Sequence, residues 1–169
     1  MKILEIKDYW SNGKLKEIGN YIDGKREGEW KEYYDNGNLH SVGTYAKDKK
    51  DGEWKEYYGN NQLYKIGIYK SGCQEGEWKE YWFNGQLSEV INYKDGKLDG
   101  EVTVIYENGQ LKFKGQYKDD KREGKWQWYL ENGELKETKM YKDGEEIEKK
   151  KMEIPKKPKM KEEKEKNER

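Results

Sequence analysis

The sequence is poor in the residues that enzymes use most often for catalysis, metal binding and cross-linking. Its 169 residues include one histidine, His40, and one cysteine, Cys73. A single cysteine excludes an internal disulfide and a cysteine-rich zinc site. A Ser–His or Cys–His mechanism could draw on only one histidine, and no phosphate-cradling glycine loop is present. We therefore expect no catalytic residues, no cofactor and no metal site, and we interpret the chain as a non-enzyme.

Long apolar segments and an excess of charge of one sign are also missing. No apolar run is long enough to span a bilayer, and the start, MKILEIKDYW, lacks the apolar stretch of a signal peptide. This favours a cytoplasmic protein, or an exported one if the chain is a trimmed fragment. The formal net charge is zero, with +4 in residues 148–169 and −4 in residues 1–147. Neither part has the dense basic patch that phosphate neutralisation requires, so we expect no nucleic-acid partner.

Aromatic residues are what the chain has in abundance. Only 31% of the residues are hydrophobic and 41% are charged, a balance that by itself favours disorder. Seven Trp and fifteen Tyr are too many for a solvated coil. Because Leu, Ile and Val are few, the buried side chains must be largely aromatic. They are expected to lie on a sheet rather than in a deep aliphatic core.

The chain repeats itself six times at a fixed period of 24 residues. With Gly28 as position 1, position 12 is Leu and position 18 is Tyr in every unit. Position 9 is always Asn, and Gly follows it in five of the six units. This self-similarity predicts six structural units of one kind. The units span residues 4–27, 28–51, 52–75, 76–99, 100–123 and 124–147.

Each unit is predicted to form a β-hairpin. Asn-Gly between two strand-like runs favours a type I′ turn, which needs positive φ at both central residues. With that turn at positions 9 and 10, position 7 pairs with 12, position 5 with 14 and position 3 with 16. The predicted fold class is therefore all-β, an elongated single-sheet array of six antiparallel hairpins with about twelve strands. A charged, Lys-rich tail follows at residues 148–169 and is expected to be disordered or partly helical.

The predicted register places a tryptophan opposite a glycine. Position 3 is Trp in four units and position 16 is Gly in four units. An aromatic ring can lie over the backbone that a glycine leaves uncovered. We therefore assign both sets a structural role, and expect a side chain added at Gly43 to displace the ring of Trp30. The two sets are Trp30, Trp54, Trp78 and Trp126, and Gly19, Gly43, Gly67 and Gly115.

The same face is predicted to carry a row of acids. Position 5 is acidic in the first four units, and the register sets Glu80 opposite Glu89 and Asp8 opposite Glu17. Such like-charge pairs are unfavourable unless they splay into water or share a cation. The row is therefore either simply solvated or an acidic, aromatic groove for a basic partner or a cation. The acid is lost in the last two units, which indicates a closed, capped end. The candidate partner surface is Asp8, Glu32, Glu56, Glu80, Trp10, Tyr34, Tyr58 and Trp82.

The repeated pattern G-x-W-x-x-Y-Y-x-N-G-x-L, followed by G-x-Y and a D-G connector, resembles the MORN-repeat variant found in tandem in many bacterial proteins. The resemblance covers residues 4–147. It implies an elongated, curled β-hairpin sheet with roles in scaffolding, in protein contacts and, for some members, in peripheral membrane association. Bacterial proteins of this variant are often labelled antitoxins of toxin–antitoxin pairs.

These observations favour a non-enzymatic scaffold that binds a protein partner through an extended aromatic and acidic β-surface. Exposed rings could instead stack on sugars or bases, but here they are needed to hold the sheet together. One alternative function is an antitoxin that neutralises a cognate toxin protein. A second is peripheral association with anionic lipid through residues 148–169. The open edges of the sheet would also allow a homo-oligomer.

Overall fold

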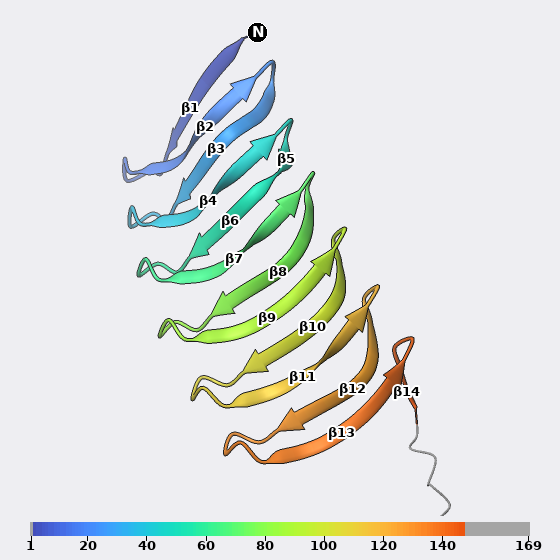
Figure 1. Ribbon diagram of the computed structural model, residues 1–169. Coiled ribbons are helices and arrows are strands. Elements are labelled where there is room, and N and C mark those ends of the chain that lie inside the picture. The colour runs from blue at the N-terminus through green and yellow to red at the C-terminus, as the bar shows by residue number, and fades with distance from the viewer. Residues whose placement is uncertain (1, 148–169) are drawn as a thin grey trace, which may run out of the picture.

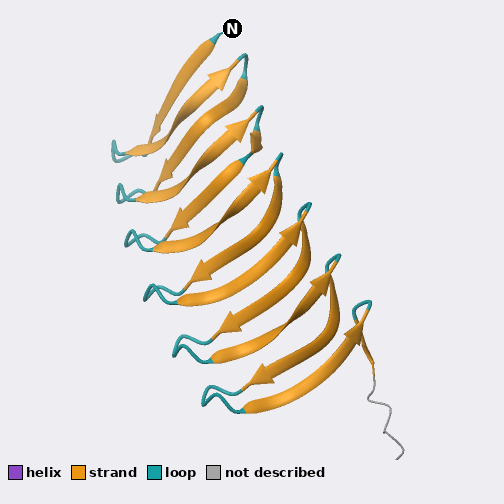
Figure 2. Ribbon diagram, viewed as in Figure 1, coloured by secondary structure: helices purple, strands orange, loops and turns teal. Residues whose placement is uncertain are grey.

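The computed structural model describes residues 2–147, which form one antiparallel sheet of 14 strands and no helix (Figures 1 and 2). Strands that are neighbours in the sheet are also neighbours in sequence, and the short β5 pairs only with β4. The all-β prediction of a single hairpin array is confirmed, while the predicted tail lies outside the described residues. The strands are β1 (Ile3–Tyr9), β2 (Leu15–Ile22), β3 (Lys25–Tyr33), β4 (Leu39–Ala46), β5 (Lys49–Lys50), β6 (Gly52–Tyr57), β7 (Leu63–Lys70), β8 (Cys73–Tyr81), β9 (Leu87–Lys94), β10 (Lys97–Ile105), β11 (Leu111–Lys118), β12 (Lys121–Tyr129), β13 (Leu135–Lys142) and β14 (Glu145–Ile147).

The Asn-Gly loops lie along one edge of the sheet (Figure 2). In the second repeat Gly37 N donates to Tyr34 O, and Tyr34 N donates to Asn38 O, each over 2.9 Å. Gly37 has a positive φ of 91°, whereas Asn36 does not have a positive φ. This is a type I turn closed by a left-handed glycine, so the predicted type I′ turn is wrong. In the third repeat Asn61 takes the glycine's place with a φ of 69°, a conformation that Asn tolerates.

The tight type I′ turns lie in the connectors instead, along the opposite edge. Asp23 and Gly24 both have positive φ, 49° and 81°, and they join Ile22 directly to its cross-strand partner Lys25. Two residues with positive φ are what this turn requires. The connector turns that share the pattern are Asp23-Gly24, Lys47-Asp48, Ser71-Gly72, Asp95-Gly96, Asp119-Asp120 and Asp143-Gly144.

The predicted register is correct in the middle of each hairpin and wrong beside its loop. Trp30 faces Gly43 and Glu32 faces Ser41, as expected for positions 3 with 16 and 5 with 14. Beyond this point the pairing shifts, so that Tyr33 at position 6 faces Leu39 at position 12. The shift follows from the loop, because a longer, bulged turn leaves one extra residue on the second strand.

A second bulge explains the glycine at position 1. Ile18 faces Lys31, but the next pair is Asn20 with Glu27, so that Gly19 alone opposes three residues of β3. Gly28, the first of those three, has a φ of 77°. A residue with a Cβ would be strained in this left-handed conformation. The bulge turns Trp30 toward the preceding strand.

Each tryptophan ring lies on the glycine of the preceding repeat. A Cβ added at Gly19 would overlap the ring of Trp30, and a Cβ added at Gly43 would overlap the ring of Trp54. The expectation that Gly43 makes room for Trp30 is therefore wrong, although the two residues are register partners. The same contact joins Gly67 to Trp78 and Gly115 to Trp126. The tryptophans thus hold successive repeats together rather than the two strands of one hairpin.

The rings build a continuous ladder along the sheet. The centroids of Tyr21 and Trp30 are 5.4 Å apart, those of Trp30 and Tyr45 5.9 Å, and those of Tyr45 and Trp54 5.1 Å, all edge to face. This geometry is the favourable one for aromatic pairs. Trp30 and Trp54 are only 3% and 2% exposed. A cation covers the remaining ring face, as where Lys50 Nζ lies 3.9 Å from the centroid of Trp54.

The ladder changes chemistry between the fourth and fifth repeats. There Val102 replaces the tryptophan, Ile91 replaces the glycine before it, and Leu98 stands where Lys50 stands two repeats earlier. Val102 is 2% exposed and packs with Ile91 in the second buried cluster. An aliphatic pair therefore fills the volume that a ring and a glycine fill elsewhere. The last repeat ends the ladder differently, with Lys139 at position 16, where it forms an ion pair of 3.0 Å with Glu146.

The aliphatic junction indicates how to test the ladder. Gly43→Ile should destabilise the protein by about 1–3 kcal/mol, because the new side chain overlaps Trp54. Adding Trp54→Val should recover part of this loss, with a coupling free energy of about 1–3 kcal/mol, because the pair then copies Ile91 and Val102. Thermal unfolding measures both values. The matched control combines Gly43→Ile with Trp30→Val, and this pair should recover no stability. If it recovered as much as the pair with Trp54→Val, the contact between the ring and Gly43 would not be specific to the following repeat.

In the first, second and fifth repeats the asparagine at position 9 ties its own loop to the next one. Asn108 Oδ1 accepts from Gln110 N over 2.9 Å, and its Nδ2 donates to Glu131 O over 2.8 Å. Asn132, in the last repeat, keeps the first of these bonds, with Glu134 N at 3.0 Å. No following loop is present within the described residues to receive the second.

Asn108→Ala should therefore cost more than Asn132→Ala. We expect a difference of about 1 kcal/mol, the net contribution of one further hydrogen bond. Thermal or denaturant unfolding of the two variants makes the comparison. Equal losses would mean that the bond to the next repeat adds nothing to stability.

Candidate functional site

A single row of side chains crosses the face of the sheet that carries the tryptophans. Glu32 alternates with Trp30 along β3 and therefore points to the same face. Every member of the row is the register partner of the next, from β1 to β13. We call this set the cross-strand row. It consists of Asp8, Glu17, Glu32, Ser41, Glu56, Lys65, Glu80, Glu89, Val104, Phe113, Trp128 and Glu137.

The row is acidic from β1 to β9. The predicted like-charge neighbours are present, since Asp8 faces Glu17 and Glu80 faces Glu89. Lys65 relieves the second pair, with its Nζ 2.8 Å from Glu80 Oε1 and both side chains 23% exposed. Glu17 and Glu56 form no ion pair with any residue in 2–147.

Glu89 and Lys65, two ionisable groups in this row, have pKa values that their surroundings shift. Burial raises the pKa of the Glu89 carboxyl, the nearby Glu80 raises it further, and Lys65 partly offsets both. Burial alone would lower the pKa of Lys65, but the hydrogen bond to Glu80 leaves it above its usual value. The fold thus disfavours the charged form of Glu89 and favours that of Lys65. Lys65 thus forms an ion pair with Glu80 and also acts on the charge of Glu89.

Position 13 connects the acids to the aromatic residues of position 7. Lys16 Nζ lies 3.0 Å from Asp8 Oδ2 and 5.5 Å from the ring centroid of Trp10. His40 Nδ1 lies 3.7 Å from Glu32 Oε2, and its ring centroid is 4.6 Å from that of Tyr34. Strict alternation along β4 would place His40 on the opposite, charged face, because its neighbour Ser41 belongs to the row. The bulge beside the loop is what brings position 13 toward position 5.

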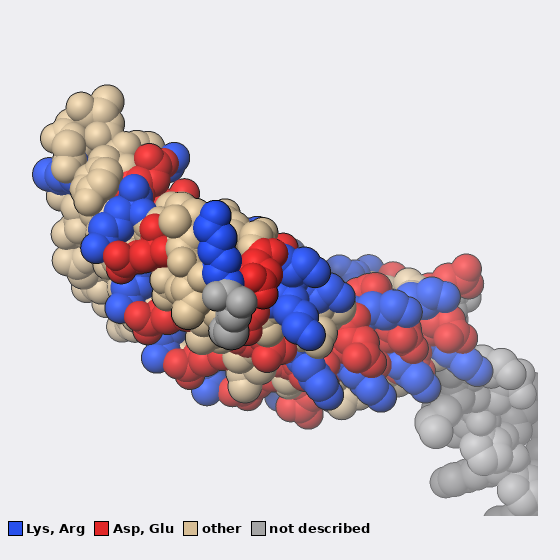
Figure 3. All heavy atoms as spheres, turned by 90° about the horizontal axis from the view of Figure 1, so that it is seen from above, with Lys and Arg blue, Asp and Glu red and all other residues tan. Residues whose placement is uncertain are grey.

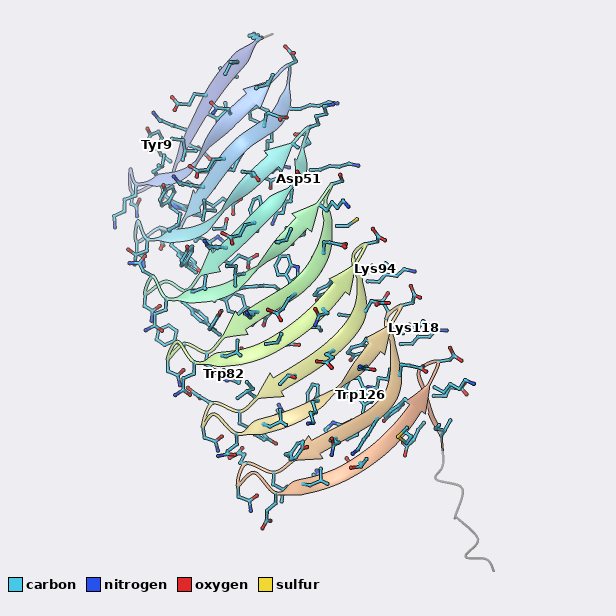
Figure 4. All side chains as sticks on the ribbon, in the orientation of Figure 1. Tyr9, Asp51, Trp82, Lys94, Lys118 and Trp126 are labelled. Carbon is cyan, nitrogen blue, oxygen red and sulfur yellow. The ribbon has the colours of Figure 1, made fainter. Side chains whose placement is uncertain are left out.

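The position 7 side chains themselves lie at the loop edge, where Figure 4 labels Trp82. In the first five repeats, where position 7 is Trp or Tyr, each donates a hydrogen bond to the backbone of the following repeat. Tyr34 Oη donates to Tyr57 O over 2.7 Å and Trp82 Nε1 donates to Ile105 O over 3.2 Å. Trp10 Nε1 and Tyr58 Oη make the equivalent bonds, of 3.0 and 2.8 Å. Their polar atoms are therefore committed to the fold, and only the half-buried rings face outward.

The row becomes apolar from β10 to β12. Val104 faces Phe113, and Phe113 faces Trp128. The rings of Phe113 and Trp128 each stack on Trp126, with centroids 5.9 Å apart and interplanar angles of 29° and 28°. Figure 4 shows Trp126 in the middle of the sheet. The predicted change of chemistry toward the last repeats is present, and it divides the cross-strand row into an acidic and an apolar section.

Acidic side chains outside the cross-strand row form hydrogen bonds and ion pairs within the fold. At the connector edge Glu27 Oε2 accepts from Lys47 N over 2.8 Å, and Glu75 Oε2 accepts from Asp95 N over 2.9 Å. On the opposite face acids and lysines pair two residues apart along one strand. Acidic and basic side chains accordingly alternate over the elongated, bent surface in Figure 3. The opposite-face pairs are Glu5–Lys7, Glu29–Lys31, Glu53–Lys55 and Glu77–Lys79, at 3.3, 2.7, 2.6 and 2.8 Å.

Other kinds of site find little support in the described residues. Within residues 2–147 no three His, Cys, Asp or Glu side chains gather closely enough to hold a metal ion. Cys73 is exposed at the start of β8. The described part of the chain contains no helix with the length and apolarity needed to cross a membrane.

Comparison with known proteins agrees with the repeat architecture. No curated protein matches the chain significantly. A family described as MORN repeat variant matches it six times in tandem, over residues 4–23, 26–47, 50–71, 74–95, 98–119 and 122–143. Repeats of this family are generally associated with protein or membrane interaction, and they are not known as enzymes. With the six hairpins and the tryptophan ladder in place, the chain belongs to the MORN repeat variant family.

Proposed function

We propose that the protein is a non-enzymatic scaffold that binds a protein partner along the cross-strand row. The observation that carries the proposal is that two carboxylates of the row's acidic section form no ion pair with any described residue. Other polar groups, such as the Asn108 amide, the Tyr34 hydroxyl and the Glu27 carboxylate, bond to a neighbouring repeat or connector. In contrast, Glu17 and Glu56 form no ion pair within residues 2–147. Carboxylates that form no ion pair within the fold are available to the basic groups of a partner.

The chemistry of the row defines that partner. Its acidic section favours basic side chains, and its apolar section favours an apolar contact at one end. Val104, Phe113 and Trp128 are half-buried, which leaves part of each side chain to be covered. A segment that crosses the sheet, with basic groups over the first four repeats and apolar groups over the last two, would match both sections.

Removing the row's charge should abolish partner capture. Affinity capture from the native cell with Glu32→Gln/Glu56→Gln/Glu80→Gln should lose a protein that the unaltered chain retains. Glu29→Gln/Glu53→Gln/Glu77→Gln is the matched control, because it alters the same strands on the opposite face. Equal capture by both variants, with both folded, would contradict the proposal.

The same experiment separates the narrower alternatives. If the captured protein is a toxin encoded next to this chain, and co-expression relieves its toxicity, the scaffold acts as an antitoxin, as the sequence resemblance suggests. If instead the full chain floats with anionic vesicles and the variant without residues 148–169 does not, the charged tail binds lipid.

The titration of Glu89 gives a further prediction. Because folding raises the pKa of Glu89, its contribution to stability is fully present below the unfolded pKa and is lost as the pH rises through the folded pKa. Glu89→Gln should therefore raise the melting temperature at pH 7 and leave it unchanged near pH 3. Thermal unfolding at both values measures this, with Glu77→Gln as the exposed control. A loss of stability at pH 7 would mean that the charged form of Glu89 supports the fold.

A further inference from the structure

We propose that residues 149–161 of the same chain dock on the C-terminal half of the cross-strand row. In this arrangement Met152 and Ile154 lie over Phe113 and Trp128, and the lysines that follow lie beside Glu89 and Glu80. The docking does not depend on the proposed function. Its consequence does, because a docked tail would compete with a partner for the same surface.

Charge is the first argument. The segment 149–161 has seven lysines and one glutamate, a net charge of +6, whereas residues 162–169 carry −1. The described residues 2–147 are net acidic, and the row concentrates six carboxylates on β1 to β9. Glu89 is the member whose charged form the fold disfavours most clearly, through burial and through Glu80. A further cation beside it would favour the charged form.

The order of chemistry along the tail is the second argument. Read outward from β14, the segment offers the lysines at 149, 150 and 151 first, then Met152 and Ile154 with Glu153 between them, and then the lysines at 156, 157, 159 and 161. Read inward from β13, the row offers Glu137 first, then Trp128, Phe113 and Val104, and then Glu89 and Glu80. The two sequences of apolar and charged groups match without a reversal of the chain.

Position and length are the third argument. Ile147 faces Met140, and the chain runs along β13 in the direction of Glu137, which belongs to the row. Between β13 and β8 lie five strand spacings, roughly 24 Å. Residues 151–161 include two prolines, and in the polyproline conformation they would span about 34 Å. The segment can therefore reach Glu80.

A spin label tests the docking in the full chain. Met160→Cys in a Cys73→Ser background keeps every lysine and offers one thiol for a nitroxide. We expect the label to broaden backbone amide signals of β8 and β9 and to leave those of β1 to β3 sharp. Raised salt should remove the broadening, because the contact is between charges near the surface.

Two double variants test whether the broadening depends on the row, and a mixture of labelled and unlabelled copies tests whether it arises within one chain. Glu80→Gln/Glu89→Gln should abolish the broadening, and Glu77→Gln/Glu101→Gln, on the opposite face, should leave it unchanged. Sharp β8 and β9 signals in the labelled protein, or equal broadening in both variants, would overturn the proposal. So would broadening that arises only between labelled and unlabelled copies in a mixture. Partner capture by the scaffold is measured separately. The docking can therefore fail while the proposed function stands, and the proposed function can fail while the docking stands.

Discussion

The fold depends on one contact, a tryptophan ring pressed on the bare backbone of a glycine in the preceding repeat. The contact needs three things at once: a ring at position 3, a glycine at position 16 and the bulge at position 1 that turns the ring backward. Burying a tryptophan contributes several kcal/mol, and truncating one costs about 3–5 kcal/mol. Because each ring serves two repeats, stability accumulates along the array and does not reside in one centre.

Much of this fold could be predicted from the sequence. The period, the hairpins, the aromatic face and the pairing of Glu32 with Ser41 follow from alternation and from the loop position alone. The identity of the tryptophan's neighbour was available too, although the register does not reveal it. Pairing within a repeat sets Trp78 against Ile91, whereas pairing with the preceding repeat sets Gly67 against Trp78 and Ile91 against Val102. The complementary volumes point to the second arrangement.

The turns and the surface show where sequence reasoning stops. Asn-Gly is compatible with two turn types, and the choice rests on whether Asn36 has positive φ, which its side chain alone does not decide. In the first, second and fifth repeats the amide of this asparagine also bonds to the next loop, a contact between units that no local rule describes. Position 13 was missed for the same reason, since only the loop bulge brings His40 beside Glu32.

Lys139 has a consequence for assembly. In a seventh repeat, or in a second copy of the chain stacked on the last strand, a ring would need the glycine that Lys139 replaces, and the lysine is already held by Glu146. The first repeat is equally unsuited, because it offers Ile6 where a ring would be required. The contact between ring and glycine that propagates the array internally is therefore absent at both ends of the six repeats, and an end-to-end stack of two copies would bring Lys139 against Ile6 in its place.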